Sequence, residues 1–494
     1  MTVSLLVFAV MVGLILFSVF LFGEEVAAGP LQISITLATL FALAVAYAHG
    51  YKGALITEAV SSNINTALGT IFVLIAIGAV IGSLYLSGTV AAFVYYGVEV
   101  LNPRFFYVSV FVLASGLSIL TGSSFTTVGA VGVAFVGLAS LMGVSPAITA
   151  GAAVSGAFLG DKVAKISDTF LLTIAVVGGV SAEEHGKSVR RTAIPTWIIT
   201  AVLFLVLGLT QSTSGSAGDL SQAQKSVAEA FHVTPWAFIP IVAIFLLSSL
   251  RLSGFISLMV SALIGIVLAA FTQPDLIVRL SGDAALNYPE QVIKVGIATM
   301  AHGFDLNSGS EHLDQLFSGG GTWSMFETVW LILMASSFGA IVDYTGMIQR
   351  VIAPLIKWAN GPLKLIFVTA LSGIGLNTLA ADPYVSIVLE GKMYRDEYIR
   401  RGIKPVYLST MIADSGTMFS PLIPWNVHGA FVAGAMGVSV LSYAPYAFMC
   451  YLSVLVTMFL AYLTSKKSTL PKGVDAAEVY GEVQGELPEP QLSA

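Results

Sequence analysis

Two aspartates interrupt a stretch between Ala147 and Val177 that is otherwise apolar and rich in small residues. Asp161 and Asp168 lie between flanks that are each about half as long as the ~20 residues needed to cross a bilayer. An ionised aspartate at the centre of a membrane helix costs about 2.5–3.5 kcal/mol, and polar backbone at that depth must be buried or line a wet cavity. The pattern is typical of a discontinuous transporter helix. A short loop between two core helices is the alternative.

A cluster of hydroxyl side chains precedes this break. Ser123, Ser124, Thr126 and Thr127 follow a glycine in a polar patch between two apolar segments. Hard cations such as Na⁺ prefer carboxylate, hydroxyl and carbonyl oxygens as ligands. The cluster therefore predicts a cation site shared with the two aspartates, although a Ser/Thr patch can also serve helix packing alone.

A second polar constellation lies in the last third of the chain. Two prolines, Pro421 and Pro424, remove backbone donors there and break the helix, so that freed carbonyls become candidate ligands. A proline-kinked structural helix is the alternative. Taking both constellations together, the candidate cation- and proton-binding residues are Asp161, Asp168, Asp382, Asp414, Ser123, Ser124, Thr126, Asn377, Thr378, Ser415, Thr417 and Asn426. We place Na⁺ at Asp168, Asp161 and Asp414.

Three basic side chains are expected to modulate these sites. Lys162 and Lys165 can form buried ion pairs with Asp161 and Asp168, or they can extend from the break to water. His428 lies just past the second break and is a candidate proton-linked group, or else a hydrogen-bonded structural histidine.

Composition places the chain in the membrane. Of its 494 residues 56% are hydrophobic and 10% charged, with a mean hydropathy of +0.88, whereas a soluble domain carries about 25% charged residues. We expect an all-α polytopic membrane protein in contact with the lipid bilayer. No basic surface suggests nucleic acid, and the single cysteine, Cys450, excludes a disulfide framework. No Walker A pattern, enzyme site or cofactor motif is present.

The chain divides into five parts by composition. A polar connection separates two apolar series, and the loop 183–191 is expected to be charged and irregular. The predicted parts are N-terminal transmembrane helices over 1–65, a first repeat over 66–191, linking helices and a polar connection over 192–323, a second repeat over 324–465, and a disordered acidic cytoplasmic tail over 466–494.

The two series resemble each other in the order of short motifs and differ in the charge of their loops. Three motif pairs recur in the same order, namely Gly78-Ala79-Val80 with Gly339-Ala340-Ile341, Asn102-Pro103 with Gly361-Pro362, and Ser115-Gly116-Leu117 with Ser372-Gly373-Ile374; Asp161 then corresponds to Asp414. The connection 143–146 is uncharged, but its counterpart, 395–404, is basic, so the positive-inside rule places them on opposite sides. Both termini come out cytoplasmic.

This topology predicts two inverted-topology repeats. Each would contain a re-entrant hairpin, over 105–142 and 363–392, followed by a discontinuous helix. Two full crossings in each hairpin segment are the alternative.

The motifs resemble those of the NhaC-type Na⁺/H⁺ antiporters, a family of the ion transporter superfamily. The first-half resemblance rests on Gly122-Ser123-Ser124, Gly160-Asp161-Lys162 and Ser167-Asp168-Thr169. The second-half resemblance rests on the runs 382–389, 414–417 and 420–426, and the whole covers about residues 70 to 460. It implies an inverted-repeat transporter fold and sodium–proton exchange. The family also includes members that exchange organic acids, such as malate for lactate, with Na⁺ and H⁺.

The sequence thus predicts a secondary antiporter of a bacterial inner membrane that exchanges cytoplasmic Na⁺ for external H⁺. The two ions would compete for one carboxylate-centred site that is exposed to one side at a time. Three departures from the family pattern, Ala413, Lys165 and His428, favour the alternative of a Na⁺- or H⁺-coupled carrier of a small organic acid or amino acid. The oligomeric state stays open, and a homodimer is one candidate.

Overall fold

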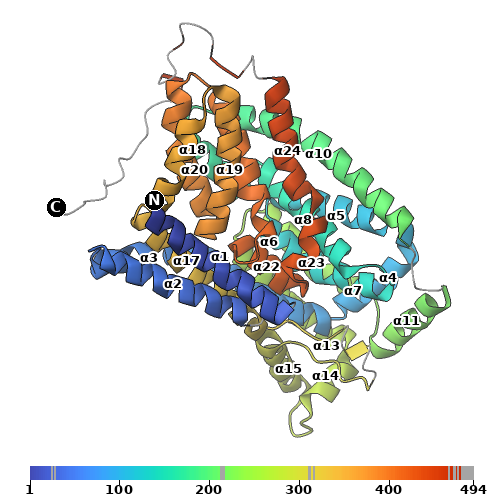
Figure 1. Cartoon of the computed structure of the whole chain (residues 1–494). Coiled ribbons are helices and arrows are strands. Elements are labelled where there is room, and N and C mark those ends of the chain that lie inside the picture. Colours follow the sequence, from blue (N-terminus) through green and yellow to red (C-terminus); the bar gives the residue numbers. More distant parts are fainter. Residues whose placement is uncertain are drawn as a thin grey trace.

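The computed structural model describes residues 1–23, 26, 29–211, 217–309, 313–314, 317–464, 468–470, 474 and 478–479, and for 217–223 the backbone alone. Most of the predicted tail over 466–494 therefore lies outside the described residues. Every named element of the described chain is a helix, as Figure 1 shows. Nine of these helices are long and apolar enough to cross a membrane, or eleven if two bent pairs each count as one span.

The helices before the long connection are α1 (Thr2–Phe22), α2 (Pro30–Ala48), α3 (Gly53–Leu86), α4 (Thr89–Val100), α5 (Phe106–Thr121), α6 (Ser124–Thr127), α7 (Val133–Leu141), α8 (Pro146–Val163), α9 (Asp168–Val177), α10 (Ala182–Thr210), α11 (Ala217–Ala230), α12 (Ile239–Ser249) and α13 (Gly254–Thr272). The later helices are α14 (Pro274–Ser281), α15 (Tyr288–His302), α17 (Phe326–Tyr344), α18 (Met347–Trp358), α19 (Pro362–Ala380), α20 (Pro383–Arg400), α21 (Pro405–Ile412), α22 (Val427–Met436), α23 (Val440–Tyr443) and α24 (Phe448–Leu463). Two π-helical segments, η3 (Val128–Gly132) and η6 (Ala413–Met418), continue α6 and α21.

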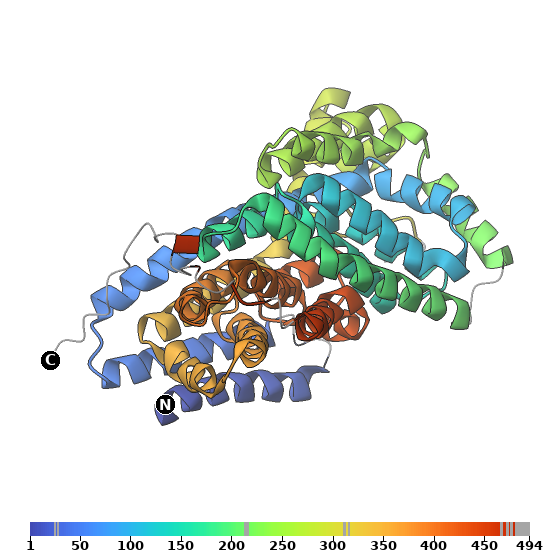
Figure 2. The same ribbon diagram turned by 90° about the horizontal axis from the view of Figure 1, so that it is seen from above.

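The N-terminal helices pack against the second half of the chain. Val7, Met11 and Ile15 recur at four-residue intervals, so they share one face of α1 and are buried there. This face belongs to the same apolar cluster as α17, where the rings of Phe8 and Phe338 meet edge to face at 6.2 Å. Figure 2 shows α1 and α2 along one side of the molecule, with the helices of the second half between them and the first half.

Close packing of α5 on α8 positions the first break. Ser118 on α5 donates from Oγ to the Gly156 carbonyl at 2.8 Å and accepts from the Gly160 amide at 3.1 Å. A Cβ atom at Gly160 would lie 2.1 Å from the Ser118 carbonyl oxygen, so only glycine permits this approach. The small residues that the sequence places before Asp161 therefore bring α8 against the hydroxyl cluster.

Both halves contain a helix pair joined by a residue with left-handed backbone. Gly122 (φ +67°) ends α5, and Ser123 then caps α6. Ala381 (φ +58°) ends α19, and Asp382 then caps α20. Both turns lie within the segments predicted as hairpins. Their re-entrant character and the inverted arrangement of the repeats stay predictions.

The structure corrects the expected loop over 183–191. These residues form the start of α10, because Ser181 and Glu184 build a reciprocal cap: Ser181 Oγ accepts from the Glu184 amide at 3.2 Å, and Glu184 accepts from the Ser181 amide at 3.1 Å. The described part of the expected polar connection before residue 323 likewise contains the helices α14 and α15.

Candidate functional site

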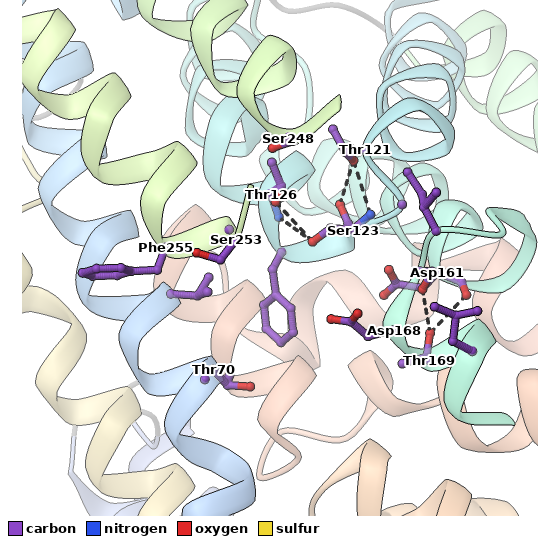
Figure 3. Close-up of a pocket in the computed structure, with 18 of the residues that line it drawn as sticks. Thr70, Thr121, Ser123, Thr126, Asp161, Asp168, Thr169, Ser248, Ser253 and Phe255 are labelled. Carbon is purple, nitrogen blue, oxygen red and sulfur yellow. Dashed lines mark hydrogen bonds between the residues drawn. The ribbon is translucent and has the colours of Figure 1, made fainter. Parts of the chain in front are cut away.

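A cavity of about 1310 Å³ lies at the first break. Its walls come from α3, the turn between α5 and α6, the break between α8 and α9, and the connection between α12 and α13. Asp161 and Asp168 both line it, and Figure 3 shows their carboxylates near each other on the same side of the cavity. Within the described part of the chain, Tyr384 is the one lining residue from the region 324–465.

The start of α6 holds the Asp161 carboxylate. Ser124 donates its amide to Asp161 Oδ1 at 3.0 Å and its hydroxyl to Oδ2 at 2.5 Å. The first amides of a helix have no partner within the helix, so they are available to an anion. Asp161 is 5% exposed and faces the cavity from a fixed position.

Asp168 is held less tightly than Asp161. It begins α9, where a negative charge is favoured by the helix dipole, and its side chain is exposed to the cavity. Thr169 next to it donates to the Asp161 carbonyl at 3.1 Å, which ties the start of α9 to the end of α8. The two carboxylates thus line the same cavity from either side of the break.

Hydroxyl oxygens add to the polar part of the cavity wall. Ser123 Oγ accepts from the amide and the hydroxyl of Thr126, both at 3.2 Å. Thr121 Oγ1 lies 3.3 Å from the Ser123 carbonyl. Ser123, Thr126 and Thr121 all line the cavity, as Figure 3 shows. Two carboxylates with neighbouring hydroxyls form the oxygen-rich set that a hard cation prefers.

Lys162 points away from this cavity. Its Nζ donates to Asp414 Oδ1 at 2.5 Å, to Ser453 Oγ at 2.7 Å and to Thr192 Oγ1 at 2.9 Å. These contacts use all three ammonium protons, and the side chain is completely buried. The expectation that Lys162 pairs with Asp161 or Asp168, or reaches water, is therefore wrong. Consecutive residues of a helix point about 100° apart, so Lys162 cannot share the direction of Asp161.

Both carboxylate oxygens of Asp414 on η6 are hydrogen-bonded, one of them to that lysine. Its Oδ1 also accepts from Ser453 at 2.5 Å, and its Oδ2 accepts from Thr457 at 2.5 Å. Asp414 is fully buried, and it does not belong to the cavity wall in the part of the chain that the structure describes. The ammonium group of the first half thus neutralises the acid at which the sequence places a third Na⁺ contact.

The two asparagines of the second polar constellation form hydrogen bonds within the fold, in part to backbone carbonyls. Asn377 donates from Nδ2 to the carbonyls of Ser415 (2.6 Å) and Gly416 (2.8 Å) on η6, and Asn426 donates to Asn377 Oδ1 at 3.1 Å. The carbonyls of Ser415 and Gly416 therefore already have a donor in the Asn377 amide group. These bonds join α19, η6 and α22.

The remaining candidates of the second half also bond within the fold. Asp382 Oδ1 accepts from the Val385 amide at 3.0 Å and so caps α20. Thr378 Oγ1 donates to the Ile374 carbonyl at 2.9 Å, and the Thr417 carbonyl accepts from Ser420 Oγ at 2.6 Å. Their positions stabilise the helix ends around η6.

Lys165 and His428 occupy contrasting environments. Lys165 is 48% exposed, lies in the cavity wall, and pairs with Glu183 at 2.6 Å, so it is this lysine that extends to water. His428 is buried. Its Nδ1 lies 2.5 Å from Ser420 Oγ, and its ring meets Phe125 and Phe158 edge to face at 5.0 and 4.9 Å.

The sequence reading missed two charged residues. Arg251, in the connection before α13, lines the cavity with a left-handed backbone (φ +62°). Glu390 on α20 is fully buried next to Ser415. The sequence alone does not mark Glu390 as buried, because the same helix also carries exposed charged residues such as Lys392.

Across the described residues, no group of three or more His, Cys, Asp or Glu side chains could hold a metal ion.

Comparisons with known proteins show what this chain is similar to. The model of the Na⁺/H⁺ antiporter family matches residues 166–464. The chain is 32% identical over 460 residues to the Na⁺/H⁺ antiporter NhaC of Alkalihalophilus pseudofirmus, covering 93% of this chain and 95% of that protein. It is 30% identical to the arginine/ornithine antiporter ArcD of Halobacterium salinarum (84% and 83% covered) and 26% identical to the malate-2H⁺/Na⁺-lactate antiporter of Bacillus subtilis (88% and 89% covered).

Proposed function

Because the chain belongs to the Na⁺/H⁺ antiporter family, we propose that it exchanges cytoplasmic Na⁺ for external H⁺ across a bacterial inner membrane. The observation that carries the proposal is that Asp161 and Asp168 line one cavity together with Ser123 and Thr126. Two ionised carboxylates that face one cavity repel each other, and either a Na⁺ ion or a proton relieves that repulsion. The two ions therefore compete for the same oxygens.

In this mechanism Asp161 is the fixed ligand and Asp168 the adaptable one. Ser124 holds both oxygens of Asp161, whereas Asp168 lies exposed at the start of α9. A Na⁺ ion would draw Asp168 toward Asp161 and take further oxygens from Ser123 and Thr126. Protonation of the site would release the ion. Rocking of one part of the molecule against the other would then expose the site to the other side.

We propose that the cavity opens toward the cytoplasm in this conformation. Lys165 and Arg251 line it and are exposed, and the basic start of α10 lies next to Lys165 through Glu183. By the positive-inside rule this face is cytoplasmic, as are both termini. Single cysteines at Ser181 and Ser145, in a Cys450→Ala background, should react with impermeant reagents from opposite sides. Labelling from the same side would refute the inverted topology.

Transport by the purified protein in proteoliposomes tests the function itself. An imposed Na⁺ gradient should drive proton movement over a range of neutral to alkaline pH. Li⁺ and K⁺ gradients should be compared in parallel. The matched control is the Asp161→Asn protein, which keeps the volume and an acceptor oxygen but lacks the charge. If the native protein moves no protons in response to Na⁺, the proposal is wrong.

A carrier of small organic acids or amino acids is the second candidate. Pockets that bind small molecules occupy roughly 300–1,000 Å³. The cavity of about 1310 Å³ therefore has room for a small organic substrate as well as for an ion. Lys165 and Arg251 in its wall could pair with a substrate carboxylate. Two relatives are named as antiporters of amino acids and of organic acids. Counterflow of radiolabelled lactate, malate, arginine and ornithine by the purified protein separates the two functions.

A further inference from the structure

Glu390 is a buried acid to which the exchange mechanism above gives no role. It lies in the middle of α20 and is completely inaccessible to solvent. Ser415 Oγ lies 2.9 Å from its Oε1, and the same hydroxyl lies 2.7 Å from the Met411 carbonyl. Its Oε2 has no hydrogen-bond partner among the described residues. Buried polar atoms are nearly always paired, so this oxygen calls for an explanation.

No cation neutralises Glu390 within the described part of the chain. On η6 it faces Ser415 and the neighbouring Asp414, whose carboxylate already holds the Lys162 ammonium. On α19 it faces Gly373.

The other charged and titratable groups on α20 are engaged elsewhere. Tyr394 bonds through its hydroxyl to Ser372 at 2.5 Å. Lys392 is exposed, and Arg395 Nε donates to the Val177 carbonyl at 2.9 Å. Glu390 is therefore surrounded by neutral groups and one already paired acid.

The fold makes room for this carboxyl group. A Cβ atom at Gly373 would lie 2.4 Å from Glu390 Oε2 and 2.3 Å from Ser415 Oγ. The absence of a side chain at Gly373 thus creates the space that Glu390 fills. An ionised carboxylate buried with a single donor and no cation would be very costly, so a neutral carboxylic acid is the form that fits this position.

We propose that Glu390 is a proton-binding site separate from the Asp161–Asp168 cavity, and that its proton is carried in the transport cycle. The inference rests on the proposed sodium–proton exchange. Rocking that separates α20 from η6 would break the Ser415 bond and admit water. The carboxylic acid would then become a carboxylate, and the proton would pass to that water; closing would require a proton to return. Glu390 would add one proton to those exchanged at the cavity.

The test is the Glu390→Gln variant in proteoliposomes, with the ratio of protons to Na⁺ ions and the pH profile as readouts. Glutamine keeps the acceptor for Ser415 but cannot release a proton. We expect one proton fewer per cycle, a changed pH profile and an unchanged half-saturating Na⁺ concentration. The control is Asp343→Asn on α17, a half-buried acid bonded by Gln349 at 2.8 Å, which should keep the native ratio. A native ratio and pH profile in Glu390→Gln would overturn the inference.

Infrared difference spectra provide an independent readout. The native protein should show a protonated-carboxyl band that responds to Na⁺ and pH and is missing in Glu390→Gln. If that variant does not fold, Ser415→Ala keeps the acid and removes its donor, so the same band should shift in frequency. A spectrum unaffected by Ser415→Ala would equally contradict the proposal. Native protein without Na⁺-driven proton movement would instead refute the proposed function, so the two failures are distinguishable.

Discussion

The two polar breaks contain similar residues but have opposite surroundings. At the first break, Asp161 is 5% exposed in the wall of a large cavity, and its bonds come from Ser124, close by on α6. At the second break, Asp414 is fully buried, and Lys162, Ser453 and Thr457 occupy both of its oxygens. Asp161 thus faces a cavity, whereas Asp414 is already paired with the ammonium group of Lys162.

Of the two acids, Asp161 therefore lines the cavity, whereas Asp414 is buried and paired with a lysine. The Lys162–Asp414 pair joins α8 to η6 and so fixes the first half against the second. A buried pair is costly to break by removing one partner, but exchange for apolar residues is often tolerated. The comparison therefore predicts effects on stability at the second break and effects on transport at the first.

Lys162→Met should have the largest effect. It leaves the buried Asp414 carboxylate without a cation, at a cost of about 3–5 kcal/mol of folding stability. Thermal unfolding of the detergent-solubilised protein measures this cost. The double variant Lys162→Met with Asp414→Leu is the matched control and should recover much of the loss. A single variant as stable as the native protein would show that the pair does not join the halves.

Asp168→Asn and Asp161→Asn should each abolish Na⁺-driven proton movement while the protein stays folded. Asparagine keeps the volume and an acceptor oxygen but can neither carry the charge nor release a proton. A bond to a charged group contributes about 1.5–3 kcal/mol, so Na⁺ affinity should fall by at least roughly tenfold. Uptake of radioactive Na⁺ into proteoliposomes is the measurement. Normal uptake by both variants would remove these residues from the site.

A glycine from each half sharpens the comparison further. Gly160→Ala brings a Cβ atom within 2.1 Å of the Ser118 backbone oxygen, so α8 must move from α5; overpacking of this kind costs about 1–3 kcal/mol. Gly416→Ala meets the Ile387 side chain at 3.0 Å, and that side chain can yield. Unfolding temperature and Na⁺ uptake should both fall more for Gly160→Ala. Equal losses would contradict the tight packing at the first break.

Lys165→Gln should have the smallest effect. Its pair with Glu183 is solvent-exposed, and such pairs contribute about 0–1 kcal/mol. We expect unchanged stability and nearly unchanged half-saturating Na⁺. Sodium titration of transport measures this, with counterflow of small acids as the companion assay. A large gain in Na⁺ affinity would show that the lysine masks the cation site, and loss of an anionic substrate's flux would make it that substrate's partner.

Local sequence was sufficient for much of the first site. A carboxylate-bearing break and a Ser/Thr cluster near a glycine were enough to predict that Asp161, Ser124 and Ser123 belong together. The start of α10 was also readable, since Ser181 and Glu184 have the spacing of a capping box, but the charges that follow suggested a loop. Charge density was the wrong criterion there.

The sequence by itself determined the membrane class, the helical fold and the places where helices break, because hydropathy, proline and glycine act on neighbouring residues. Only the tertiary structure decided which acid meets which partner. Lys162 reaches Asp414, Ser453 and Thr192 from positions far apart in the chain, and Glu390 meets Ser415 because Gly373 leaves room. The direction of a side chain follows from the 100° step of its helix, but the group that it meets depends on how distant helices pack.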